Sequence, residues 1–143
     1  MIISEHNVEL FYQLNEEREV PLIVVNADRS DDGKNLYEEL KSATEKSFVL
    51  VIIKVNNWSD ELSPWPAEPV FGKHPFNGKG PDYLRQLEDL IIPELIKEIN
   101  CAISYKVIAG YSLAGLFALY AGYNTDCFEK IVSASGSLWY PGF

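Results

Sequence analysis

Ser112 is the residue of this sequence whose surroundings are best suited to covalent chemistry. It stands in GYSLAG, residues 110–115, between an apolar strand-like run and a helix-like run. A serine nucleophile can sit above a sheet on such a tight strand-to-helix turn, if the positions two residues away are small. Gly110 and Ala114 occupy those positions, and Gly115 removes a third side chain near the strands. The pattern predicts a nucleophile for acyl transfer; the alternative is a glycine-rich start that serves only close helix packing.

The same turn predicts a donor for an oxyanion. Leu113 follows Ser112 at the start of the helical run. Backbone N–H groups in the first turn of a helix have no intrahelical partner, and the helix dipole makes this end positive. The Leu113 amide is therefore expected to stabilise the negative oxygen that forms when the serine attacks a carbonyl.

The partners that a serine nucleophile needs are harder to find. No histidine follows Ser112, and the only acidic residues after it, Asp126 and Glu129, are expected at the opposite end of the sheet. His74 lies on a loop after a strand and is a candidate base, with a solvated surface role as the alternative. His6 is expected to be a surface residue at the start of an edge strand.

Strands and helices alternate along the chain. Pro93 is expected to kink or split the long second helix. Strands that alternate with helices indicate an α/β fold with a mostly parallel sheet covered on both faces, here as one domain over residues 1–143. The predicted strands are 8–14, 21–26, 48–55, 105–109 and 130–134, and the predicted helices are 34–44, 82–99 and 113–123.

An irregular segment rich in proline and aromatic residues, 57–81, separates the second and third buried strands. Loops of this length are usually functional or disordered. The segment is expected to form an aromatic wall of a small-molecule pocket; the alternative is a flap that only covers the core. The candidate pocket residues are Trp58, Trp65, Phe71, His74, Tyr111 and Trp139.

Composition and charge exclude several classes of partner. The net charge of −9 disfavours nucleic acid and anionic membrane surfaces, and no apolar stretch reaches the roughly 18 residues that a membrane span requires. The chain is expected to be cytoplasmic, and Cys101 and Cys127 to be free, half-buried thiols. Neither a metal site nor a cofactor is expected.

Beyond these local arguments, the chain resembles the predicted esterases of the α/β-hydrolase superfamily, in the esterase D and enterochelin-esterase branch. The resemblance covers residue 8 to the last residue and rests on segments 110–119, 133–140, 65–67 and 82–84. It implies a three-layer α/β-hydrolase-like fold whose sheet has about five strands. Strand 8–14 would be an antiparallel edge strand, with 48–55 between it and 21–26.

The resemblance also assigns roles to residues. It implies that Ser112 is the nucleophile and that a second oxyanion amide comes from Ala27 or Asp28, after strand 21–26. The alternative for residues 26–33 is an ordinary helix-capping turn.

The family continues into further strands that carry its acid and histidine, whereas this sequence ends at residue 143. The resemblance therefore implies a member truncated at its carboxyl end. Strand 130–134 would be left as an unpaired edge, which predicts a homodimer through that strand or aggregation.

Two functions of different class follow. The first is a serine hydrolase that cleaves a small-molecule carboxylic ester or thioester through an acyl-enzyme on Ser112, with weak turnover because no acid and histidine follow; an acyltransferase would need the same missing base. The second is a non-catalytic hydrolase-fold domain that binds a small ligand or a protein partner.

Overall fold

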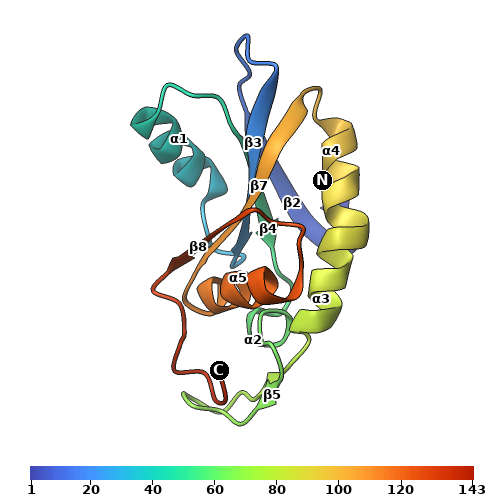
Figure 1. The fold of residues 1–143 in the computed structure, drawn as a ribbon. Coiled ribbons are helices and arrows are strands. Elements are labelled where there is room, and N and C mark those ends of the chain that lie inside the picture. The colour runs from blue at the N-terminus through green and yellow to red at the C-terminus, as the bar shows by residue number, and fades with distance from the viewer.

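The computed structural model describes all 143 residues, and Figure 1 shows a twisted sheet with helices on both faces. The six strands of the main sheet have the order β1-β2-β4-β3-β7-β8. These strands are β1 (Ile2–Ile3), β2 (His6–Tyr12), β3 (Glu19–Ala27), β4 (Val49–Lys54), β7 (Ala102–Tyr111) and β8 (Lys130–Ala134).

Strands β3, β4, β7 and β8 pair in parallel, and β2 pairs with β4 antiparallel. The expected position of the segment 48–55 between 8–14 and 21–26 is confirmed by the order β2-β4-β3. The expected sheet lacked one strand, the short β1, because two residues carry no detectable periodicity. Parallel strands with crossover helices give the α/β class that the alternating pattern predicted.

Helix α1 (Gly33–Ala43) lies on one face of the sheet, and α3 (Gly80–Gln86), α4 (Ile92–Glu98) and α5 (Ser112–Asn124) lie on the other (Figure 1). Alternate residues of β4 point to the two opposite faces of the sheet. Val49 and Val51 belong to the large core beneath α3, α4 and α5, whereas Leu50 and Ile52 pack towards α1 with Tyr37. The side-chain period of two in a strand explains why β4 is apolar throughout.

Pro93 has the effect on the long helix that its chemistry predicts. Residues Leu87–Ile91, between α3 and α4, form a π-helical turn, and Pro93 lies in the first turn of α4. Proline has no N–H and its ring collides with the preceding turn, so the ordinary helical ladder cannot pass through this position. A wider turn lets one continuous apolar face, including Leu87 and Ile91, stay buried on the sheet.

The segment 57–81 is more ordered than an irregular loop. It contains α2 (Trp58–Glu61) and a two-stranded ribbon of β5 (Pro66–Ala67) and β6 (Phe76–Asn77). The indole Nε1–H of Trp65, in this segment, donates a hydrogen bond to the Pro141 carbonyl at 2.7 Å. The Tyr140 hydroxyl in turn donates to the Trp65 carbonyl at 2.5 Å. These two bonds hold the segment against the last residues of the chain.

No helix of the structure has the length and apolar character that crossing a membrane would require. Cys101 and Cys127 are free and half-buried, as predicted.

Candidate active site

Ser112 sits on the strained turn that its neighbours predicted. It is the first residue of α5, directly after β7, and its φ of 52° is in the left-handed region. Such a φ is unfavourable for residues other than glycine and persists where surrounding structure enforces it, often at functional sites. The serine is partly exposed rather than covered by neighbouring side chains.

The two small flanking residues explain how the turn closes. A Cβ atom on Gly110 would lie 2.5 Å from the backbone carbonyl carbon and oxygen of Ala114. The backbone of α5 therefore passes directly over the end of β7, and a side chain at position 110 has no room. This contact confirms why the sequence has glycine two residues before Ser112.

The loop after β8 holds Ser112 from a second direction. The Ser137 amide donates to the Ser112 carbonyl at 3.0 Å, and the Oγ atoms of the two serines are 3.3 Å apart. Ser137 is buried, and Ser135 in the same loop has a φ of 49°. Ser137 is thus the one side chain that hydrogen-bonds the Ser112 hydroxyl. The sequence carries no spacing signal for this contact, because the two serines are 25 residues apart.

The predicted oxyanion donors differ in their surroundings. Leu113 is the second residue of α5, where the N–H has no intrahelical acceptor. Asp28 donates its N–H to Asp31 Oδ2 at 2.7 Å, so this amide already has a partner. Ala27 ends β3, is buried, and accepts a hydrogen bond from Val55 through its carbonyl. Leu113 remains the candidate with a free donor by helix geometry.

Asp31 connects the loop after β3 to Tyr111, the residue before Ser112. Besides the Asp28 amide, its Oδ2 accepts from the Tyr111 hydroxyl at 3.0 Å. Tyr111 also contacts the indole ring of Trp58, with 5.3 Å between ring centroids. One carboxylate therefore fixes both the loop and the aromatic side chain beside Ser112.

The environment of Tyr111 changes its acidity. Burial raises the pKa of the Tyr111 phenol first, the hydrogen bond to Asp31 and the carboxylate charge add to this, and the pKa reaches about 12. We expect Asp31→Asn to lower this pKa towards the ordinary value of 10.0, because an uncharged amide no longer opposes formation of the phenolate. Burial would keep part of the shift.

Carbon-13 NMR of Cζ-labelled tyrosine measures this titration, with Tyr111→Phe used to assign the resonance. Asp32→Asn is the matched control, because Asp32 instead accepts from the Asn35 amide at the start of α1. An unchanged titration of Tyr111 in the Asp31 variant would show that the carboxylate does not control it.

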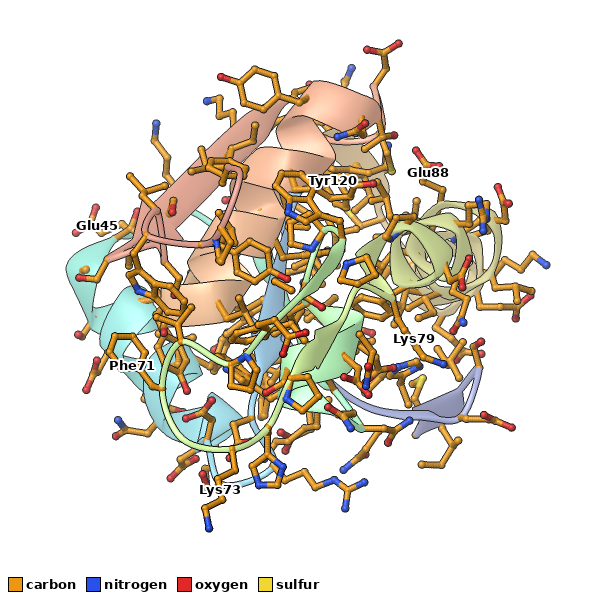
Figure 2. All side chains as sticks on the ribbon, turned by 90° about the horizontal axis from the view of Figure 1, so that it is seen from below. Glu45, Phe71, Lys73, Lys79, Glu88 and Tyr120 are labelled. Carbon is orange, nitrogen blue, oxygen red and sulfur yellow. The ribbon has the colours of Figure 1, made fainter.

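Five of the six predicted pocket residues lie in three aromatic groups, and the sixth, His74, borders a hollow that Trp58 also lines. Trp58 contacts Tyr111 beside Ser112, whereas Phe71 packs edge-on against Trp139, with ring centroids 5.1 Å apart. Trp65 instead packs on Tyr140 and Phe143 in the cluster that anchors the loop. Phe71 lies on the outer part of the loop in Figure 2 and is 73% exposed. The Trp58 and Tyr111 pair is thus the aromatic surface next to Ser112, and one pocket shared by all six residues stays a prediction.

The two histidines have different environments, and neither hydrogen-bonds Ser112. His74 is exposed and borders an open hollow of about 390 Å³ that Trp58, Asp60 and Asn77 also line. The expectation that His6 is a surface residue is wrong: it is 2% exposed and its Nε2 pairs with Glu61. The chain folds α2 onto the start of β2, which the local pattern around residue 6 does not reveal.

The acidic residues after Ser112 do not reach it either. Glu129 accepts from the Lys106 amide at 2.6 Å, at the beginning of β8, whereas Ser112 follows the end of β7. No group of three or more histidine, cysteine, aspartate or glutamate side chains is placed to hold a metal ion. Ser112 thus lies on a tight turn with the Ser137 hydroxyl as its hydrogen-bond partner, and no histidine or carboxylate of this chain hydrogen-bonds its side chain.

Comparison with known proteins identifies the family of the chain. The model of the Esterase family, described as "Putative esterase", matches residues 8–141. The Bacillus subtilis protein "Uncharacterized protein YbbA" is 33% identical over 122 residues, which are 76% of this chain and 48% of YbbA.

Two solved structures have a similar fold. The siderophore hydrolase EstB from Aspergillus nidulans superposes with a TM-score of 0.76 and 20% identity, over 99% of this chain and 56% of EstB. The enterochelin esterase from Shigella flexneri gives a TM-score of 0.65 and 25% identity, over 95% of this chain and 34% of that protein. The chain therefore spans about half the length of YbbA and of EstB, and about a third of the length of the Shigella flexneri esterase. The family match over nearly all its residues shows that this chain belongs to the Esterase family.

Proposed function

We propose that this chain provides the nucleophile half of a serine hydrolase that cleaves a carboxylic ester or thioester through an acyl-enzyme on Ser112. The observation that supports this most is the left-handed φ of 52° at a partly exposed serine between β7 and α5. A nucleophile elbow has this geometry, with a strained serine on the turn from the carboxyl end of a parallel strand into a helix.

In this mechanism, Ser112 Oγ attacks the carbonyl carbon and the oxyanion binds the Leu113 amide at the start of α5. The tetrahedral intermediate then releases the alcohol or thiol, and water hydrolyses the acyl-enzyme. The hydrogen bond between Ser112 and Ser137 holds the attacking hydroxyl in one position. The Trp58 and Tyr111 pair offers an apolar surface to the acyl or leaving group.

The proton of Ser112 has no strong acceptor in this chain. Ser137 is a neutral hydroxyl, so in this chain alone the proton passes to water. Oxyanion binding and positioning alone retain about 10³ to 10⁴-fold catalysis over water in serine hydrolases without a working triad. We therefore expect slow turnover by this chain alone.

A fluorophosphonate probe tests the proposal, because the serine oxygen displaces fluoride from phosphorus and keeps the label. We expect labelling of one peptide, the one that contains Ser112, and no labelling of Ser112→Ala. Ser59→Ala is the matched control, since Ser59 follows Trp58 in α2. Equal labelling of Ser112→Ala and the unmodified chain would refute a nucleophilic Ser112.

The absence of a base beside Ser112 favours a second candidate, a non-catalytic domain that binds an acyl compound at the surface around Ser112. Binding of a ligand to the folded state raises the melting temperature. This candidate predicts no fluorophosphonate label, together with a melting-temperature increase by short acyl esters that Ser112→Ala retains and Trp58→Ala loses. Labelling at Ser112 would exclude it.

A further inference from the structure

The end of β8 and the loop that follows it are bound to the start of α5 at two points. Ser133 of β8 donates through Oγ to the Gly115 carbonyl at 2.9 Å, and the Ser137 amide donates to the Ser112 carbonyl at 3.0 Å. The loop packs tightly here, because a Cβ atom on Gly136 would lie 2.4 Å from Ser133 Oγ. These contacts hold the Ser137 side chain beside Ser112.

Burial decides the direction of the hydrogen bond between the two serine hydroxyls. Ser137 is 2% exposed, and its Oγ has one hydrogen-bond partner, Ser112 Oγ at 3.3 Å. A buried hydroxyl needs an acceptor for its proton, and solvent does not reach this one. Ser137 therefore donates to Ser112 Oγ. Ser112 is partly exposed, so its own O–H group is free to face solvent and to lose its proton there.

The length of this bond suits a contact that strengthens during a reaction. At 3.3 Å it is longer than the usual distance of about 2.7 to 2.8 Å between two hydroxyl oxygens, so it is weak while Ser112 is neutral. Hydrogen bonds to an ionised acceptor are shorter and about twice as strong. The bond from Ser137 should therefore strengthen as Ser112 Oγ loses its proton. An interaction that is stronger in the transition state than in the ground state accelerates the chemical step.

We propose that Ser137 is a catalytic residue whose hydroxyl stabilises negative charge on Ser112 Oγ, an inference that rests on the proposed function. In acylation, Ser112 Oγ bonds to the carbonyl carbon, the carbonyl π electrons move to the oxyanion, and the Ser112 proton leaves to solvent. In deacylation, water adds to the acyl carbon and releases a proton. The bond from that carbon to Ser112 Oγ then breaks, and the oxygen keeps the electron pair and takes up a proton. Ser137 donates to the same oxygen in both steps and keeps its own proton.

A thiol in place of Ser112 tests this donation without any reaction on an ester. Ser112→Cys, in a chain that also carries Cys101→Ser and Cys127→Ser, leaves one thiol. The pH dependence of its alkylation by iodoacetamide gives the pKa of that thiol. A hydroxyl that donates to the sulfur stabilises the thiolate, so we expect Ser137→Ala to raise this pKa by about 1.

Ser133→Ala is the matched control for the thiol titration. Its hydroxyl also joins β8 and its loop to α5, but through the Gly115 carbonyl and not through residue 112. A change in pKa that came only from loosening the loop would appear in both variants, whereas loss of a donor to the sulfur would appear only in Ser137→Ala. A thiol pKa that Ser137→Ala leaves unchanged, or that both variants raise equally, would overturn the proposal.

The rate of fluorophosphonate labelling gives a second measurement, with Ser112 in place. We expect Ser137→Ala to label about tenfold more slowly than the unmodified chain, and Ser133→Ala to label at close to the unmodified rate. Ser137→Cys, whose S–H group is a weaker donor, should label at an intermediate rate. Equal rates for Ser137→Ala and the unmodified chain would overturn the role of Ser137 while Ser112 remains the nucleophile. An unmodified chain that does not label would overturn the proposed function itself, and with it the catalytic role of Ser137.

Discussion

Gly110→Ala is expected to destabilise the fold by about 3 kcal/mol, at the upper end of what overpacking usually costs. The new Cβ would lie 2.5 Å from the carbonyl carbon and oxygen of Ala114, both backbone atoms of the first turn of α5. Backbone atoms cannot rotate away as a side chain can. Relief requires α5 to move from the end of β7, which would also displace Ser112.

The matched control for this prediction is Gly122→Ala in the same helix. A Cβ there would come within 1.9 Å of Cδ1 of Ile131, but that atom ends a flexible side chain that is 39% exposed and free to turn. Alanine also favours a helix by about 1 kcal/mol over glycine. We expect the control to change stability by less than about 1 kcal/mol. Urea unfolding measures both, and equal free energies of unfolding for the two variants would contradict the steric account.

The tight turn at Ser112 could be predicted from sequence because its steric requirements are local. Residues 110 and 114 on either side of Ser112 must be small because a larger side chain at position 110 would collide with the backbone of residue 114. The steric requirement and the residues that meet it therefore lie in one short segment of the sequence. The buried strands β3 and β4 and the helices α1 and α5 were predicted for the same reason, since continuous apolar runs and helical periodicity are written within each element. Their observed limits differ from the predicted ones by a few residues at most.

Features that depend on the packing of distant segments could not be predicted. His6 and Glu61 are 55 residues apart, and Ser137 meets Ser112 only because the loop after β8 returns over the start of α5. The segment 57–81 was recognised as too long for a connector, but its attachment through Trp65 to Pro141 depends on where the last residues of the chain lie. The local sequence around these residues contains no pattern that would indicate the contacts.

His6 and Glu61 form a buried pair that joins β2 to α2, the helix that begins at Trp58. Their side chains are only 3% and 16% exposed. His6 Nδ1 also lies 2.8 Å from the Ser4 carbonyl oxygen, and Glu61 Oε2 accepts from the Asn56 and Asn57 amides at 2.6 and 2.8 Å. Removing one member of such a pair leaves the other desolvated without its counter-charge, which costs about 3 kcal/mol. We expect this loss for Glu61→Gln near pH 5.5.

The dependence on pH follows from the two shifts. Burial alone would lower the pKa of His6, but the hydrogen bond and charge of Glu61 outweigh it and the pKa is raised above 6.5. Burial alone would raise the pKa of Glu61, but the bonds from His6 and the backbone amides outweigh it and the pKa is lowered below 4.5. The stabilisation from His6 is complete below pH 6.5 and disappears as pH rises through its raised pKa. That from Glu61 is complete above pH 4.5 and disappears as pH falls through its lowered pKa.

The pair should therefore stabilise the fold most between pH 4.5 and 6.5. Urea unfolding of the unmodified chain, His6→Gln, Glu61→Gln and the double variant at pH 5.5 and 8.5 gives the coupling energy at each pH. We expect this energy to be larger at pH 5.5, because the charge of His6 decreases as pH rises through its raised pKa. Glu94→Gln, which breaks the exposed pair with Lys97, serves as control and should cost less than about 1 kcal/mol at both values. A coupling energy that is the same at both pH values would show that the charge of His6 does not change between them, and would contradict this account.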